Sequence, residues 1–167
     1  RTYSSGFTQR PDLTTMGAFS GLEIACWDII GKDRNRPVWA LLGGLMNERI
    51  RAYSYLYPLA KHDTDYFWSS ADMAAESALD LVARGYTAVK FDPAGPYTMR
   101  GGHMPSMRDI EISVAFCKSI REAIGDNADL LFGTHGQFNT AGAIRLGQAI
   151  EPYQPLWFEE PIPPDNL

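Results

Sequence analysis

The sequence predicts an α/β protein with a parallel sheet, because strand-like and helix-like segments alternate from about residue 49 onward. Short strands separated by helical patterns are typical of parallel strands joined by helical crossovers. The predicted strands are Arg49–Tyr57, Thr87–Asp92, Asp129–His135 and Leu156–Glu160. The predicted helices between them are Ala71–Arg84, Ser106–Ile124 and Thr140–Ile150.

The segment before the first strand predicts a helix from Met16 to Leu42, with a break at Asn35–Pro37. Its apolar residues recur at three- and four-residue intervals, and Gly43-Gly44 then ends it. Gly85 and Gly125 follow two of the later helices as C-terminal caps.

Ser106 is a plausible N-cap for the helix that follows it. The third residue of that helix is Asp109, which is shorter than the Glu usual in a capping box.

Polar residues follow three of the predicted strands, in Lys90-Phe-Asp92, Gly133-Thr-His135 and Glu159-Glu160. In a β/α barrel such strand ends meet at one mouth, where the active site is built. A doubly wound open sheet also binds ligands at strand ends, but it usually carries a glycine-rich loop after its first strand. Pro58–Lys61 stands there instead, so the barrel is favoured.

The composition limits the classes of partner that we expect. The net charge of −5, with 15 scattered Lys and Arg among 167 residues, makes nucleic acid an unexpected partner. No apolar run reaches the length of a membrane span, so no membrane partner is expected. Cys26 and Cys117 lie in apolar, helix-periodic stretches, which predicts two buried thiols and suits a reducing cytoplasm.

We expect both termini to lie inside a longer chain. We also expect the loop Pro93–Pro105 either to carry function or to be disordered.

Two stretches of the chain carry a family resemblance. The run from Ala18 to Lys32, continued by Pro37-Val38 and Leu41–Gly43, resembles the first signature of the mandelate racemase and muconate lactonizing enzyme family of the enolase superfamily. Cys26 departs from the Leu or Ala usual there. The spacing from Gly133 to Pro161 resembles the second signature.

The resemblance implies the first half of a modified TIM-type β/α barrel over residues 20–167, preceded over residues 1–19 by the tail of an α+β capping domain. It also implies Mg²⁺ and proton abstraction next to a carboxylate, which gives an enediolate. A hard divalent ion bound by carboxylates stabilises the two negative oxygens of that intermediate.

The resemblance places Glu159 as a metal ligand, although two adjacent acids could instead be helix-start charges near Pro161. The two-residue period of a strand directs Glu160 to the opposite side, as a structural ion-pair partner. Lys90 and Asp92 share one face and stand where racemases keep two lysines. Asp92 thus removes the usual racemase base, unless it only forms the turn before Pro93.

His135 stands where galactonate dehydratases carry a catalytic His, and a His can donate a proton to a departing hydroxyl. A strand-end His is also often only a satisfied polar residue. Gly133 departs from the family's first metal ligand, which is Asp. Three alternatives stay open: Asp92 replaces that carboxylate, His135 swings to the metal, or the ion and the activity are lost.

The sequence therefore predicts a Mg²⁺-dependent sugar-acid dehydratase, with His135 as the acid, Lys90 orienting the substrate carboxylate, and Glu159 with Asp92 holding the metal. The base is expected on later barrel strands. The alternatives are a racemase or cycloisomerase on the same scaffold, or a relative that only binds a ligand. A small sugar acid is the expected substrate, and the complete protein is expected to form a homo-oligomer in the cytoplasm.

Overall fold

The structure is a computed structural model that describes residues 12–92 and 102–164. Most of the loop Pro93–Pro105 lies outside the described residues. The chain divides into two compact units, Arg1–Ile50 and Arg51–Leu167, and each is described by itself. The domain boundary expected after residue 19 stays a prediction.

The first unit contains the helix α1 (Leu13–Asp33) and the short helix α2 (Val38–Leu41). The carboxylate of Asp12 caps α1 by accepting the Thr15 amide at 2.8 Å. The predicted helix with a break is confirmed, although α1 begins three residues earlier than predicted. Gly43 and Gly44 end the segment with positive φ angles of 117° and 109°, which residues with a side chain rarely adopt.

The apolar residues of α1 are mostly exposed, and only Gly31 is buried within this helix. The prediction of two buried thiols is wrong for Cys26, which is exposed, and right for Cys117. The physical reason is that periodicity shows that a helix has an apolar face but does not supply the element that covers it. The described residues of the first unit leave that face open.

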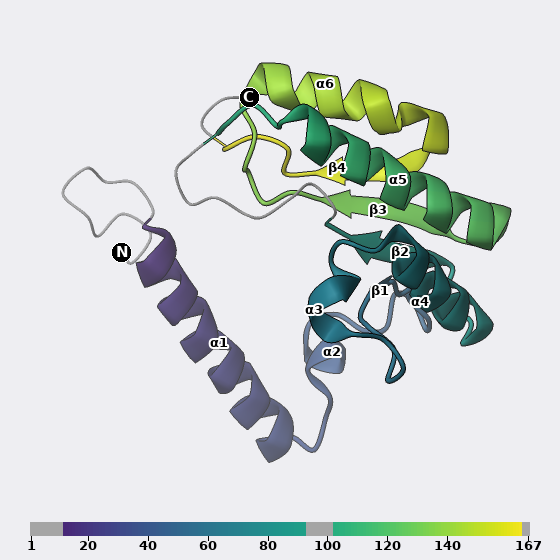
Figure 1. The fold of residues 1–167 in the computed structure, drawn as a ribbon. Coiled ribbons are helices and arrows are strands. Elements are labelled where there is room, and N and C mark those ends of the chain that lie inside the picture. The colour runs from purple at the N-terminus through teal and green to yellow at the C-terminus, as the bar shows by residue number, and fades with distance from the viewer. Residues whose placement is uncertain (1–11, 93–101, 165–167) are drawn as a thin grey trace. The chain divides into compact units, whose positions relative to one another are not determined.

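The second unit is built on a four-stranded parallel sheet in the order β1-β2-β3-β4 (Figure 1). Its strands are β1 (Ser54–Tyr55), β2 (Ala88–Phe91), β3 (Asp129–Gly133) and β4 (Pro155–Glu159). Its helices are α3 (Thr64–Phe67), α4 (Ala71–Ala83), α5 (Met107–Ile124) and α6 (Thr140–Ile150), with 3-10 turns at Gly125–Asn127 and Glu151–Tyr153. No helix among the described residues is long and apolar enough to cross a membrane.

Three strands are shorter than predicted: β1, β2, which loses one residue at each end, and β3. Only Ser54 and Tyr55 of β1 pair with β2. Upstream, the Arg51 side chain instead donates to the Thr87 hydroxyl at 2.8 Å and reaches the Asp129 carboxylate at 2.5 Å. β3 ends at Gly133, two residues before the predicted end, because His135 adopts a φ of 51° that extended strands cannot hold.

The helix ends follow the predicted capping chemistry. Gly85 after α4 and Gly125 after α5 both have positive φ angles, of 93° and 54°. The expectation that Asp109 is too short for a capping box is wrong. Its carboxylate accepts the Ser106 amide at 3.1 Å while the Ser106 hydroxyl accepts the Asp109 amide at the same distance.

The two faces of the sheet differ in chemistry. One face packs against the helices to form the core, and the register places Phe91, Phe132 and Phe158 side by side across it. The opposite face carries Lys90 from β2 and, by the same two-residue period, Gly133 and Glu159 from the next two strands. The polar strand ends therefore lie on the face that the helices do not cover.

The sheet is curved toward that polar face. Tyr53, just before β1, packs edge-on against Trp157 of β4 with ring centroids 5.6 Å apart, although two strands separate them in the sheet. A flat sheet would keep strands that are three positions apart about 14 Å from each other. Parallel strands, helical crossovers and this curvature together are part of a β/α barrel.

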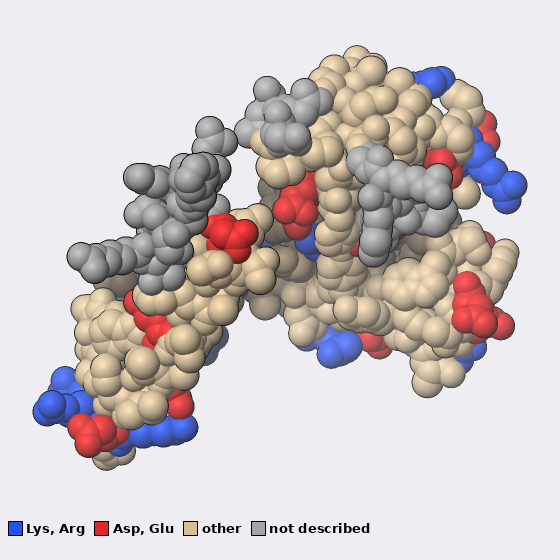
Figure 2. All heavy atoms as spheres, turned by 90° about the vertical axis from the view of Figure 1, so that its left-hand side faces the viewer, with Lys and Arg blue, Asp and Glu red and all other residues tan. Residues whose placement is uncertain are grey.

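Charged residues are dispersed over the surface drawn in Figure 2, where Lys and Arg occur in small groups interspersed with Asp and Glu. That distribution agrees with the scattered basic residues of the sequence. The absence of a nucleic-acid partner stays a prediction.

Candidate active site

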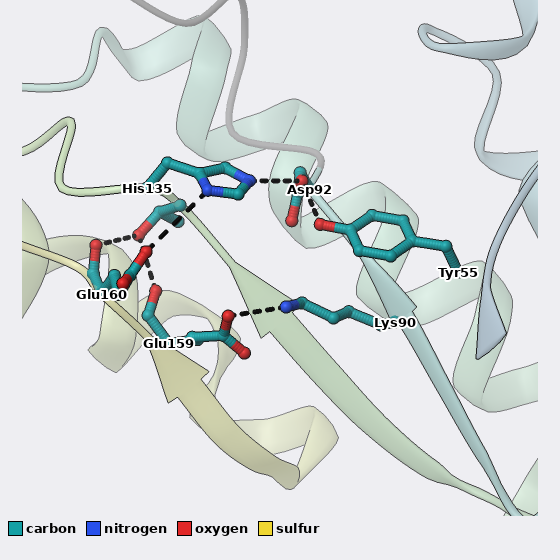
Figure 3. A network of polar contacts seen from close by, with 7 residues as sticks. Tyr55, Lys90, Asp92, His135, Glu159 and Glu160 are labelled. Carbon is teal, nitrogen blue, oxygen red and sulfur yellow. Dashed lines mark hydrogen bonds and ion pairs between the residues drawn. The ribbon is translucent and has the colours of Figure 1, made fainter. Parts of the chain in front are cut away.

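Side chains from the ends of all four strands converge on the concave face of the sheet (Figure 3). Tyr55 comes from β1, Lys90 and Asp92 from β2 and the residue after it, and Glu159 from β4. His135 follows β3 within two residues. The structure thus brings together every residue that the sequence singled out for chemistry.

Lys90 and Glu159 form the inner ion pair of the site. The Lys90 ammonium lies 2.6 Å from Glu159 Oε1, and it also lies over the ring of Tyr55 at 5.3 Å. Burial lowers the pKa of Lys90, but the hydrogen bond with Glu159 and the negative charges of Glu159 and Asp92 outweigh it, so the pKa is raised. Lys90 is therefore a fixed cation at neutral pH and a poor general base.

The carboxylate of Asp92 is held at one oxygen and open at the other. Its Oδ2 accepts a hydrogen bond from the Tyr55 hydroxyl and lies 3.3 Å from His135 Nε2. Its Oδ1 is buried and has no hydrogen-bond partner among the described residues. Burial, followed by the contact with Asp92, raises the pKa of Tyr55, so the phenol keeps its proton and donates. A buried oxygen without a partner marks a place for a ligand, an ion or water.

Gly133 leaves the space that Asp92 occupies. A Cβ built on Gly133 would lie under 3.0 Å from Asp92 Oδ1 and 3.0 Å from Lys90 Cε. Continuing the pairing of Phe91 with Phe132 by one residue places Asp92 beside Gly133, which accounts for the contact. The carboxylate at the end of β2 thus occupies the space that a side chain at the end of β3 would take. That Asp92 replaces the family's first metal ligand stays a prediction.

His135 lies between two carboxylates. Its Nε2 faces Asp92, and its Nδ1 lies 3.8 Å from Glu160 Oε2. Both His135 and Glu160 have left-handed backbones, with φ angles of 51° and 46°. Residues with side chains occupy that region at a cost of about 1–3 kcal/mol, and they cluster at functional sites. Glu160 contacts His135 rather than the inner pair. Because Glu160 follows β4 with a left-handed backbone, the two-residue period from which its direction was predicted does not apply to it.

The backbone that carries His135 is fixed to the end of β4. Buried Thr134 donates its hydroxyl to the carbonyls of Glu159 and Glu160 at 3.0 and 2.9 Å. The Gly136 amide donates to the Glu160 carbonyl at 2.6 Å, and on the other side the His103 amide donates to the Gln137 carbonyl at 3.0 Å. The turn that presents the imidazole is therefore supported from both neighbouring segments.

Sequence reasoning missed Tyr55. The period of two in Tyr53-Ser-Tyr-Leu-Tyr57 indicates a one-sided aromatic row, and the pairing of Tyr55 with Lys90 puts that row on the polar face. The alternation was therefore the signal, but the pairing register was needed to interpret it.

A divalent cation fits two of the side chains present. Carboxylate oxygens are the ligands that Mg²⁺ prefers, and Asp92 Oδ1 is a buried acceptor to which no described residue donates a hydrogen bond. Among residues 12–92 and 102–164, however, no group of three or more His, Cys, Asp or Glu side chains is placed to hold a metal ion. Asp92 and Glu159 would thus supply part of a coordination sphere.

The comparisons with known proteins agree with this architecture. The family described as Enolase C-terminal domain-like matches residues 73–167, and the Mandelate racemase / muconate lactonizing enzyme, N-terminal domain matches residues 4–43. A D-gluconate/D-galactonate dehydratase of Picrophilus torridus is 37% identical over 163 residues, which cover 98% of this chain and 39% of that relative. A D-gluconate dehydratase of Thermoproteus tenax is 32% identical over 165 residues, which cover 99% of this chain and 31% of that relative.

A crystal structure of a mandelate racemase/muconate lactonizing enzyme from Sulfitobacter sp. matches with a TM-score of 0.95 and 80% identity, over 99% of this chain and 42% of that one. The curved parallel sheet with charged side chains at its strand ends defines the protein as part of a β/α barrel. The chain belongs to the mandelate racemase and muconate lactonizing enzyme family of the enolase superfamily. It spans well under half the length of the relatives it matches.

Proposed function

We propose that the complete protein catalyses the Mg²⁺-dependent dehydration of an aldonate, such as galactonate or gluconate, to a 2-keto-3-deoxy acid. The observation that carries the proposal is the position of His135 beside Asp92 at the strand ends that also hold Lys90 and Glu159. An acid for a leaving hydroxyl then lies next to cationic and carboxylate groups suited to a bound sugar acid. The relatives named as gluconate and galactonate dehydratases support the substrate class.

Lys90 and the carboxylates prepare the site for the substrate's acid group. A bound Mg²⁺ would be held in part by Glu159 and Asp92, and it would stabilise the negative charge that develops on the substrate carboxylate. Lys90 keeps its proton and provides a second, fixed positive charge in a water-poor position. It orients the substrate carboxylate rather than removing the proton next to it.

His135 serves as the general acid in this proposal. It lies at the solvent-facing side of the group, with the carboxylates of Asp92 and Glu160 on either side of its ring. The proton that it donates converts the departing hydroxyl into water. The base that removes the α-proton lies in the part of the protein beyond this chain. The proposal also includes a small sugar acid as the substrate, a cytoplasmic location and a homo-oligomeric complete protein. It includes no nucleic-acid or membrane partner.

The test is a panel of aldonates given to the complete protein with and without Mg²⁺. We expect release of a 2-keto-3-deoxy acid, measured by its semicarbazone absorbance, and its loss on chelation. Epimerised or cyclised products without elimination would establish the isomerase alternative. If the complete protein shows no turnover and does not bind Mg²⁺, the alternative of a relative that only binds a ligand is supported instead.

A further inference from the structure

The two carboxylate oxygens of Asp92 have different surroundings. Oδ2 is engaged twice, by the Tyr55 hydroxyl and by His135 Nε2. Oδ1 is buried and has no hydrogen-bond partner in the part of the chain that the structure describes, and the side chain as a whole is 13% exposed. A carboxylate that is fixed through one oxygen presents the other in a defined direction.

We propose that Tyr55 is the positioning residue that fixes the Asp92 carboxylate with Oδ1 free for a cation, in a space that exists only because residue 133 is glycine. This inference rests on the proposed function for the identity of the cation. The three residues come from β1, from the end of β2 and from the end of β3, so the unit spans three neighbouring strands.

Steric contacts couple Asp92 to Gly133. Any side chain at position 133 would bring its Cβ under 3.0 Å from Oδ1, a separation that real Cβ atoms essentially never show. Its contact with Lys90 Cε, at 3.0 Å, involves the far end of a flexible side chain and is easier to relieve. The main effect of Gly133→Ala is therefore to displace the Asp92 carboxylate.

Tyr55 controls the same carboxylate from the other side. Removing a group that hydrogen-bonds to a metal-ligating side chain typically weakens metal affinity about 10–100-fold. We therefore expect Tyr55→Phe, which removes only the hydroxyl, to weaken Mg²⁺ binding by about that factor. Tyr57→Phe is the matched control, because Tyr57 is exposed and its hydroxyl makes no hydrogen bond to any residue that the structure describes.

The experiment uses the complete protein. Isothermal titration with MgCl₂ compares the wild type with Tyr55→Phe and Tyr57→Phe, and thermal unfolding in chelator compares Gly133→Ala in the wild-type and Asp92→Ala backgrounds. We expect weaker binding for Tyr55→Phe alone. We also expect Gly133→Ala to lower Tm by about 2–4 °C more in the wild-type background than in the Asp92→Ala background, a change typical of roughly 1 kcal/mol in a larger domain.

Two results would overturn the inference: unchanged Mg²⁺ affinity in Tyr55→Phe, or an equal loss of Tm from Gly133→Ala in both backgrounds. The contact with Lys90 Cε is common to the two backgrounds and cancels in the comparison. A wild type that does not bind Mg²⁺ refutes both the proposed function and the role of Oδ1 as a cation ligand. In that case the thermal comparison still decides whether Gly133 makes room for Asp92.

Discussion

Replacing Glu159 by Gln tests the inner ion pair, and the adjacent Glu160→Gln provides a matched control. The Lys90 and Glu159 side chains are 7% and 34% exposed and lie 2.6 Å apart. Removing one partner of a fully buried pair costs about 3–5 kcal/mol, because the remaining charge is left without compensation. Glu159 is partly exposed to water, and the side-chain amide of the Gln that replaces it can still accept a hydrogen bond from Lys90. We therefore expect Glu159→Gln to lower the free energy of unfolding by about 2 kcal/mol, or about 30-fold in the folding equilibrium.

For Glu160→Gln we expect a smaller loss of stability than for Glu159→Gln. Its side chain is 65% exposed, and its carboxylate lies 3.8 Å from His135 Nδ1. Exposed pairs of this kind contribute about 0–1 kcal/mol. Glu160→Gln should therefore change stability by less than about 0.5 kcal/mol.

The assay is urea unfolding of the complete protein in chelator, with the midpoint compared at unchanged m-value. Titration of each variant with Mg²⁺ then separates stability from metal binding. Glu159→Gln should also weaken Mg²⁺ binding and abolish turnover, since a neutral amide offers a hard cation only a dipole. Equal losses at the two positions would show that the assignment of strand faces is wrong.

Three further predictions concern other parts of the chain. His135→Asn should lower aldonate turnover by about 10²–10⁴-fold while the substrate's α-hydrogen still exchanges with deuterium, and normal elimination in the variant would contradict the role of the acid. The isolated 167-residue polypeptide should be poorly soluble, because β1 and β4 are open sheet edges, and a monodisperse monomer with a sharp thermal transition would disprove this. Burial raises the pKa of Cys117 to about 12 from an ordinary value of 9.0, so the folded thiol holds its proton when the unfolded one has lost it. Between pH 9 and about 12 this should lower the free energy of unfolding by up to about 1.4 kcal/mol per pH unit, and alkaline urea titrations should show that additional slope in the wild type but not in Cys117→Ala.

Local chemistry was sufficient to predict the helices of the second unit. The helix α6 spans Thr140–Ile150 as predicted, and α4 ends one residue earlier than predicted. Apolar periodicity, an N-cap and a glycine with positive φ all act within a few residues, so the sequence records them directly. The two residues of β1 were harder to predict, because pairing with β2 rather than composition sets their limits.

The candidate site was predictable in its residues but not in its contacts. Strand-end position and family resemblance identified Lys90, Asp92, His135 and Glu159, and the structure places them together. The exchange of space between Asp92 and Gly133 depends on the alignment of β2 with β3, across 41 positions of sequence. Side-chain alternation predicts which face a residue occupies, but only the pairing register shows which residue lies beside it.

The irregular pairing between β3 and β4 has a consequence for the alignment of their ends. Leu130 pairs with Pro155 and Leu131 with Trp157, so Leu156 is an extra residue at the start of β4. Beyond it the pairing is regular as far as Gly133 and Glu159. The extra residue therefore sets which residue of β4 ends beside Gly133. If the pairing of Leu130 with Pro155 continued regularly, the register would shift by one, and Phe158 rather than Glu159 would stand opposite Gly133.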